Sequence, residues 1–302
     1  MLFLIFHMLL VTLAAMVIVV LLRRAAEANV AKFTVGKASV WAIADSVGDR
    51  DASTFPGADP QALSQYMPSG KAPTAIMVFL VKIENELILI DAGLGAASGD
   101  KASHLLDRLK LIGVSPEQIT SVLVTHMHPD HIGGLIRPDK PDEKAFPSAR
   151  VLSSRVEHDF WLSEESPKLF PERAAGFEMA RRILGIYGAA SETFEFGDMV
   201  APGIRAIDAR GHTPGNTLFL LESEGERLLF WADTLHAAAL QFPRPDINAH
   251  FDMDPKASAE ARVRFMEMPA EENLPIAGTH LPFPGIGTVK RRPEGGYVFI
   301  SH

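Results

Sequence analysis

The stretch THMHPDH, residues 125–131, places three imidazoles and one carboxylate within six positions. Residues 121–124, just before it, are a short apolar run that predicts a buried strand. Gly133 and Gly134, just after it, predict a loop or a tight helix start. Because α/β proteins usually place their chemistry at the carboxyl ends of strands, this stretch predicts an α/β fold with a functional site at one sheet edge.

The spacing within this stretch points to metal ions. In extended or turning backbone, His126 and His128 point to one side, since side chains repeat every two residues. A bend at Pro129 can then aim Asp130 and His131 at a second point. Imidazole and carboxylate groups together suit zinc and neighbouring divalent metals. We therefore expect two metal positions close to each other.

Three more candidate ligands stand in the same context, each after a short apolar run. If these strand ends converge at one edge of a sheet sandwich, each metal keeps an open coordination position, as catalytic metals require. The expected ligands are His126, His128 and His212 at one position, Asp130, His131 and His280 at the other, and Asp233 as a bridge between them.

Two other residues near these motifs have open roles. Asp91 ends an apolar run beside Gly93. It either caps its own backbone or accepts a hydrogen bond from the ring nitrogen of a ligand imidazole that does not bind the metal. His236 lies three residues after Asp233. It either donates to Asp233 or to a substrate, or it is a packed structural histidine.

The composition narrows the class of protein. A chain of 302 residues, 47% of them hydrophobic, is long enough for one large α/β domain with a full core. The net charge of -8 argues against nucleic acid as a partner. The chain has no cysteine, so disulfides and thiolate metal ligands are excluded.

Residues 2–22 are almost wholly apolar, which is long enough for one membrane-crossing helix. Arg23 and Arg24 follow, and residues 26–28 (Ala-Glu-Ala) are similar to a signal-peptide cleavage site. We favour an uncleaved anchor over a removed signal, because no Lys or Arg precedes the apolar run. The predicted division is an anchor or signal at 1–22, a linker at 23–36 and one domain at 37–302. The predicted location is the membrane or the cell envelope, periplasmic or secreted if residues 1–28 are cleaved.

Strand and helix patterns alternate in two halves of the chain, which predicts a layered α/β fold. Residues 48–70 are rich in Asp, Ser, Pro and Gly and are predicted to form a surface loop. Asp254 followed by Pro255 predicts a helix start, with the helix running to about residue 268. The expected strands are 38–44, 76–83, 87–90 and 121–124 in the first half, and 204–209, 217–222, 227–232 and 274–277 in the second.

Together with the ligand pattern, residues 128–135 (HPDHIGGL), 233–236 (DTLH) and 279–287 (THLPFPGIG) resemble the metallo-β-lactamase superfamily. The resemblance runs from about residue 33 to the end and is strongest to the methyl parathion hydrolase-like branch, with quorum-quenching lactonases as neighbours. It implies an αββα sandwich of four layers. Two departures matter: the cysteine ligand of many β-lactamases is missing, and His128 stands where redox members carry a glutamate.

The resemblance implies a hydrolase with two divalent metal ions, zinc first among them, and a metal-bridging hydroxide as nucleophile. Its substrates would be small esters, lactones or organophosphate triesters. Asp130 and Asp233 are the expected catalytic residues, with Asp130 steering or receiving a proton. The alternatives are an N-acyl homoserine lactonase and a non-catalytic, membrane-anchored metal-binding module. The expected partners are a small-molecule substrate and the membrane through residues 2–22, with an oligomer left open.

Overall fold

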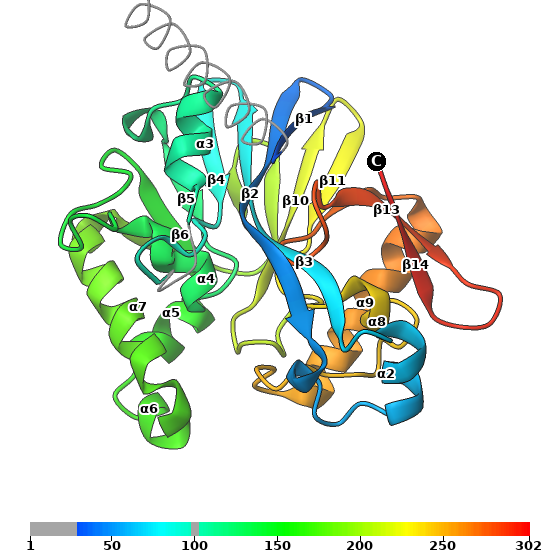
Figure 1. Cartoon of the computed structure of the whole chain (residues 1–302). Coiled ribbons are helices and arrows are strands. Elements are labelled where there is room, and N and C mark those ends of the chain that lie inside the picture. The colour runs from blue at the N-terminus through cyan, green and yellow to red at the C-terminus, as the bar shows by residue number, and fades with distance from the viewer. Residues whose placement is uncertain (1–28, 98–102) are drawn as a thin grey trace, which may run out of the picture.

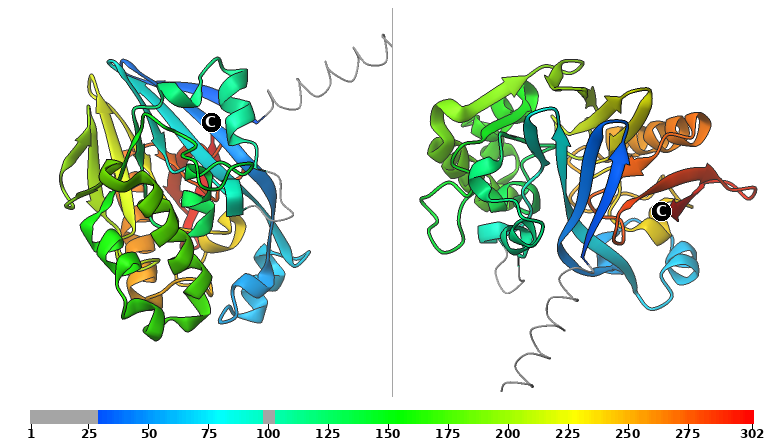
Figure 2. Two further views of the ribbon diagram at one scale, coloured as in Figure 1. Left: turned by 90° about the vertical axis from the view of Figure 1, so that its left-hand side faces the viewer. Right: turned by 90° about the horizontal axis from the view of Figure 1, so that it is seen from above.

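The computed structural model describes residues 29–97 and 103–302. Two seven-stranded sheets face each other, with helices on their outer sides (Figures 1 and 2). The first sheet runs in chain order: β1 (Val30–Val35), β2 (Ala38–Asp51), β3 (Lys71–Ile83), β4 (Glu86–Ile90), β5 (Ser121–Leu123), β6 (Arg150–Ser154) and β7 (Ser191–Phe194). The second sheet also runs in chain order: β8 (Met199–Ala201), β9 (Ile204–Asp208), β10 (Thr217–Ser223), β11 (Glu226–Phe230), β12 (Ile276–Ala277), β13 (Ile286–Arg291) and β14 (Tyr297–Ser301).

Three layers of apolar side chains hold these elements together. Between the sheets, Phe79 of β3 packs against Phe230 of β11 with ring centroids 5.4 Å apart. Outside the first sheet, Leu109 of α3 (Leu105–Leu111) and Phe177 of α7 (Ala174–Tyr187) belong to one buried cluster. Outside the second sheet, Phe265 of α9 (Pro255–Glu272) belongs to another. The helices are α2 (Pro60–Tyr66), α3 (Leu105–Leu111), α4 (Pro129–Ile132), α5 (Arg155–Leu162), α6 (Ser166–Leu169), α7 (Ala174–Tyr187), α8 (Ala238–Gln241) and α9 (Pro255–Glu272).

Strand directions bring the candidate site to one edge of the sandwich. In the first sheet, β4, β5, β6 and β7 run parallel, so their carboxyl ends share one edge. In the second sheet, β11 is parallel to β12, and β9 and β11 are both antiparallel to β10. The segments that follow β4, β5, β9, β11 and β12 carry all the predicted site residues, with Asp130 and His131 in the short helix α4 after β5. The layered α/β prediction is therefore confirmed as a mixed fold of two sheets and helices.

Two expectations about local structure are wrong. The predicted linker includes residues 30–35, which form β1 and pair with residues 38–43 of β2. The predicted loop at 48–70 contains the end of β2, which continues to Asp51 as one arm of a long hairpin with β3, and it contains α2. That helix forms because Asp59 accepts a hydrogen bond from Gln61 N (3.0 Å) and Pro60 fits its first position.

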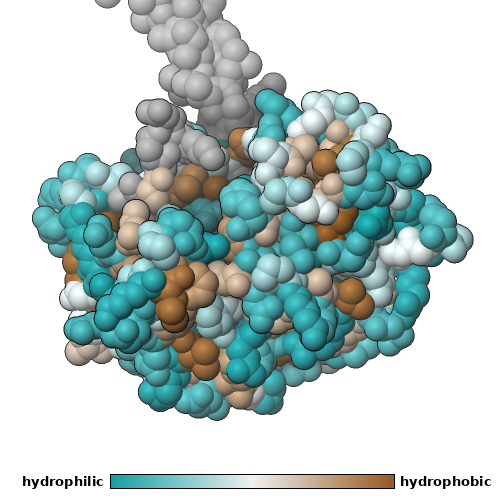
Figure 3. Space-filling view, turned by 90° about the horizontal axis from the view of Figure 1, so that it is seen from below, coloured by the Kyte–Doolittle hydropathy of each residue, from teal (hydrophilic) through white to brown (hydrophobic). Residues whose placement is uncertain are grey.

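The predicted anchor or signal at 1–22 lies outside the described residues. Within 29–97 and 103–302, no helix combines the length and the apolar character needed to cross a bilayer. The face shown in Figure 3 has hydrophilic residues around small hydrophobic patches. Scattered apolar residues of this kind are normal on a protein surface.

Candidate metal centre

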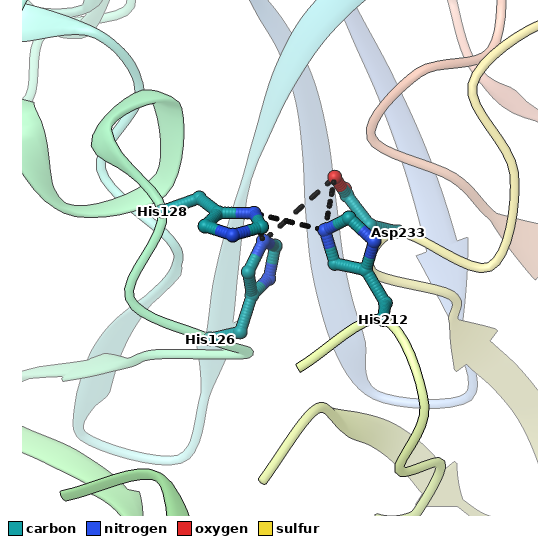
Figure 4. Close-up of side chains that lie close together, drawn as sticks. All are labelled: His126, His128, His212 and Asp233. Atoms are coloured by element: carbon teal, nitrogen blue, oxygen red, sulfur yellow. Dashed lines mark hydrogen bonds and ion pairs between the residues drawn. The ribbon is translucent and has the colours of Figure 1, made fainter. Parts of the chain in front are cut away.

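The three histidines predicted for one metal position meet Asp233 at the edge where the strands end. His126 and His128 follow β5, His212 follows β9, and Asp233 follows β11. His126 Nε2 and His212 Nε2 lie 3.0 and 2.9 Å from His128 Nδ1. Asp233 Oδ2 lies 3.3 Å from His212 Nε2 and 3.7 Å from His126 Nε2. Figure 4 shows these four side chains pointing toward one another.

The second predicted group lies directly beside the first and shares Asp233 with it. His131 Nε2 is 3.1 Å from Asp233 Oδ1, and His280 Nε2 is 3.1 Å from Asp233 Oδ2. Asp130 Oδ2 is 3.5 Å from His280 Nε2. All seven predicted ligands are thus brought together. Two groups among them have ligand atoms close enough to hold a metal ion: His126, His128, His212 and Asp233 in one, and Asp130, His131 and His280 in the other.

These residues fit divalent cations on two structural grounds. His131 Nε2 and Asp233 Oδ1 are buried without a hydrogen-bond partner, although buried polar atoms normally have one. The set combines nitrogen and oxygen donors, which is the chemistry that zinc and related ions take. A cation between the two groups would satisfy both orphaned atoms.

The electrostatics of the centre agree with this fit. Burial is the main cause that holds the pKa of His126 and of His128 well below the usual value, so both rings are neutral. Burial opposes ionisation of Asp233, but His280 and His131 nevertheless hold the pKa of its carboxyl well below its usual range. For His131, the carboxylates of Asp233 and Asp91 overcome burial and raise the pKa well above its usual value. The charged ring supplies positive charge to the buried carboxylates, and a bound cation would supply that charge in its place and leave Nε2 deprotonated.

Hydrogen bonds made by Nδ1, the ring nitrogen that points away from the centre, fix the orientation of two imidazoles. Asp91 Oδ2 accepts from His131 Nδ1 (2.8 Å), and its Oδ1 accepts from Thr125 N (2.8 Å). Of the two roles left open for Asp91, this geometry matches the one in which it holds an imidazole. His280 Nδ1 donates to Ala75 O (3.0 Å). Because Nδ1 keeps its proton in each case, Nε2 is the atom that would present a lone pair to a bound cation.

His236 lies inside the centre rather than at its margin. Its Nε2 is 3.0 Å from Asp233 Oδ2, and its Nδ1 is buried without a partner. Burial lowers the pKa of His236 to about 3, so the ring is neutral. The same atoms also bring it close enough to Asp233 and His280 to form a metal-binding group with them. The contact with Asp233 matches the first of the three roles left open for this histidine.

Asp252 is a part of the centre that sequence reasoning missed. Its Oδ1 accepts from His212 Nδ1 (2.8 Å), and its Oδ2 accepts from Ala249 N (3.0 Å) and from the buried Arg262 (3.1 Å). It lies in the irregular segment between α8 and α9, where no strand end or spacing marks it.

Glu157 was also missed, although it ties two of the ligand loops together. It is fully buried at the start of α5. Its Oε1 accepts from Met127 N (2.9 Å) and Trp161 Nε1 (2.6 Å), and its Oε2 accepts from Thr213 Oγ1 (2.8 Å) and Gly215 N (2.8 Å). The only sequence signal is a glutamate one helical turn before a tryptophan, which is too common to single it out.

A cavity of about 280 Å³ opens onto the centre. Its lining includes Asp130, whose side chain is 27% exposed, and Phe251. Two arginines, Arg50 and Arg173, complete one part of the wall. A second cavity of about 410 Å³ shares Arg50, Pro129 and Asp130 with the first. Small molecules therefore have access to the buried side chains through the first cavity, and the second cavity adjoins it at these three residues.

Comparison with known proteins agrees with this geometry. The family model described as the metallo-beta-lactamase superfamily matches residues 72–280. The crystal structure of the hydrolase AbOPH, described as being in the beta lactamase superfamily, is 31% identical with a TM-score of 0.84, covering 91% of this chain and 98% of that one. AidC, described as a dizinc quorum-quenching lactonase, is 27% identical with a TM-score of 0.82, covering 91% and 97%.

One curated relative is the atrochrysone carboxyl ACP thioesterase of Passalora fulva. It is 31% identical over 161 residues, which are 52% of this chain but 37% of that protein. The family match, in contrast, extends over more than half of this chain and ends at His280, the last of the predicted ligands. The chain belongs to the metallo-beta-lactamase superfamily.

Proposed function

We propose that this protein is a hydrolase that works with two divalent metal ions, zinc first among them. The observation that carries the proposal is the convergence of seven nitrogen and oxygen donors, with His131 Nε2 and Asp233 Oδ1 buried and unpartnered between them. Similarity to a dizinc lactonase and to the hydrolase AbOPH over 91% of the chain supports it.

Each residue of the centre has a role that follows from its position. His126, His128 and His212 would hold one ion, Asp130, His131 and His280 the other, and Asp233 would touch both. When bound, such ions supply Lewis-acid chemistry that makes water nucleophilic at neutral pH and polarises a carbonyl or phosphoryl group.

The remaining chemistry belongs to the protein's own groups. Asp91 and Asp252 keep the protons of His131 and His212 on Nδ1, so that each Nε2 stays available. Asp130 is the carboxylate of the set with an exposed part in the cavity. It is therefore the group placed to take a proton from the attacking water and to return it to the leaving group.

The substrate class is a small ester, lactone or organophosphate triester. A cavity of about 280 Å³ beside one of about 410 Å³ fits molecules of that size rather than a polymer. An N-acyl homoserine lactonase is the second candidate, favoured by the TM-score of 0.82 to AidC, a lactonase solved with N-hexnoyl-L-homoserine. A non-catalytic module is disfavoured, because a structural site needs no cavity over its ligands.

The test combines elemental analysis with a substrate panel. Purified protein should contain two divalent ions per chain and hydrolyse at least one of an aryl ester, an acyl-homoserine lactone and an aryl phosphotriester. A chelator should abolish turnover, and zinc should restore it. His128→Ala and Asp233→Ala should each lose most turnover and bound metal. Near-normal turnover and two ions in either variant would refute the ligand assignment, and absence of turnover throughout the panel would favour the module.

We also propose that residues 2–22 attach the protein to a membrane in the cell envelope. The support is the apolar character of that stretch alone.

A further inference from the structure

Two arginines stand out among the residues that line the cavity over the metal centre. Arg50, near the end of β2, and Arg173, which ends the short 3-10 helix Pro171–Arg173, both line this space. The Nε atoms of both guanidinium groups are buried and have no hydrogen-bond partner. Two fixed positive charges therefore face the same small volume.

Neither arginine has the carboxylate partner that other arginines of this acidic chain have. Arg50 stacks on the ring of Phe251 at 5.4 Å, and among the residues that the structure describes no hydrogen bond or ion pair is found for its side chain. The carboxylates near Arg173 are the exposed Glu172, at 3.7 Å, and the buried Asp252, and neither accepts a hydrogen bond from Arg173. In contrast, a carboxylate within 3.2 Å pairs with each of Arg137, Arg150, Arg155, Arg210, Arg244 and Arg262.

Both arginines contact Phe251, one at its side chain and the other at its backbone. Arg50 lies over its ring, and Arg173 Nη2 donates to its carbonyl oxygen (2.9 Å). Their positions are therefore set by the protein. The Arg50 guanidinium group and the Nε–H of Arg173 have no acceptor among the residues that the structure describes. Guanidinium groups with free N–H donors bind carboxylates and phosphates preferentially, through two parallel hydrogen bonds.

The contact of Arg173 with His128 supports the same interpretation. Arg173 Nη1 donates to His128 Nε2 (3.2 Å), which requires the ring proton to be on Nδ1. His128 Nδ1 is the atom that faces the centre. If Nδ1 binds a cation, the ring proton must be on Nε2, which then no longer accepts. A cation on Nδ1 would therefore free Arg173 Nη1 from His128.

We infer that the substrate carries, apart from the bond that is hydrolysed, an anionic carboxylate or phosphate group, and that Arg50 and Arg173 bind this group beside Phe251. The inference deepens the proposed function and rests on it for the hydrolysed bond. It makes the natural substrate an anionic ester or lactone rather than a neutral one. The arginines act on substrate binding and take no part in breaking the bond.

The test compares anilides that carry or lack an anionic group, first by binding and then by turnover. Calorimetry with the metal-loaded protein uses non-hydrolysable amides: acetanilide as the neutral ligand, succinanilic acid as the carboxylate and an anilide bearing a phosphate monoester. The corresponding aryl esters are then used for kcat and KM. Variants are Arg50→Met, Arg50→Lys and Arg173→Met. The control is Arg150→Ala, which removes an exposed arginine of β6 that pairs with Glu192 outside the cavity.

Wild type should bind at least one anionic amide about ten- to a hundredfold more tightly than the neutral one, as expected for hydrogen bonds between charged groups. Arg50→Met should remove most of that preference, and the loss should appear in the KM of the anionic ester rather than in its kcat, as expected for loss of binding alone. Arg50→Lys should retain part of it, and Arg150→Ala all of it. Which anion is preferred distinguishes carboxylate from phosphate.

Equal binding of neutral and anionic amides by the wild-type protein would overturn the inference. This measurement needs no variant, so the inference can be refuted even if a variant fails to fold. A preference that survives in both Arg50→Met and Arg173→Met would overturn it as well. If no ester is hydrolysed, the proposed function fails, while the amide measurement still decides whether the arginines bind an anion.

Discussion

Replacing Glu157 by glutamine tests how the ligand loops are held. The carboxylate accepts four hydrogen bonds, two at each oxygen, from Met127, Trp161, Thr213 and Gly215. A glutamine keeps one oxygen and must turn its NH₂ toward one of the two pairs of donors. Facing Met127 N and Trp161 Nε1, it would leave two buried donors without acceptors. It will therefore face Thr213 and Gly215.

The magnitude follows from that orientation. The Thr213 hydroxyl can rotate and accept from the new amide, but Gly215 N can only donate and loses its acceptor. One buried unsatisfied N–H costs about 1–3 kcal/mol, so we expect Glu157→Gln to lower the free energy of unfolding by about 2 kcal/mol. Because Met127 lies between His126 and His128, and Thr213 follows His212, metal affinity should also fall by about 10–100-fold.

Urea unfolding of the metal-free protein measures the first quantity, and competition with a chromophoric chelator measures the second. The matched control is Glu178→Gln, which makes the same change at an exposed position of α7. Unchanged metal affinity in Glu157→Gln would refute the view that this carboxylate sets the geometry of the loops. An equal loss in Glu178→Gln would show that the effect is one of net charge.

Four further predictions follow from the same structure. Removing the metals should lower the melting temperature measured by calorimetry, because ions present at 100 times their Kd stabilise the fold by about 2.7 kcal/mol; an unchanged melting temperature would contradict a metal centre within the fold. Asp91→Asn should weaken metal binding by about 10–100-fold in chelator competition, since an amide cannot accept from both His131 and Thr125, and wild-type affinity would argue against its orienting role. Gly134→Ala would place a methyl group 1.9 Å from the carbonyl oxygen of Ala92, so urea unfolding should show a loss of about 1–3 kcal/mol, and an equally stable variant would mean that the loops can separate. Deleting residues 1–28 should move the protein from the membrane fraction to the supernatant of an ultracentrifuge run, and a full-length protein already in the supernatant would rule out the anchor.

The parts of the centre that could be predicted share one feature, which is a place directly after an apolar strand. A buried strand leaves a clear apolar run, and polar residues grouped at its end indicate chemistry rather than packing. His212 and His280 were identified in this way, although neither belongs to a local motif as dense as residues 125–131. The layered arrangement of strands and helices was predictable for the same reason.

The parts of the centre that were not predicted lie where no hydrophobic periodicity or strand end marks them. Asp252 belongs to an irregular segment, and Glu157 lies with Trp161 on the buried face of a short helix, where a charged residue is not expected. Arg50 belongs to the polar end of β2, whose composition is typical of a loop because this arm of the hairpin is largely exposed. In each case the role comes from contacts between distant segments, which composition and spacing do not encode.

The candidate ligands come from both halves of the sandwich: residues 126–131 follow a strand of the first sheet, whereas His212, Asp233 and His280 follow strands of the second. Neither half of the polypeptide contains a complete centre. Catalytic competence must therefore appear late in folding, after the two sheets have docked, and a nascent chain that has not reached residue 280 lacks one of its ligands. Under the proposed function, turnover would report correct assembly directly, because a partly folded chain lacks part of the ligand set.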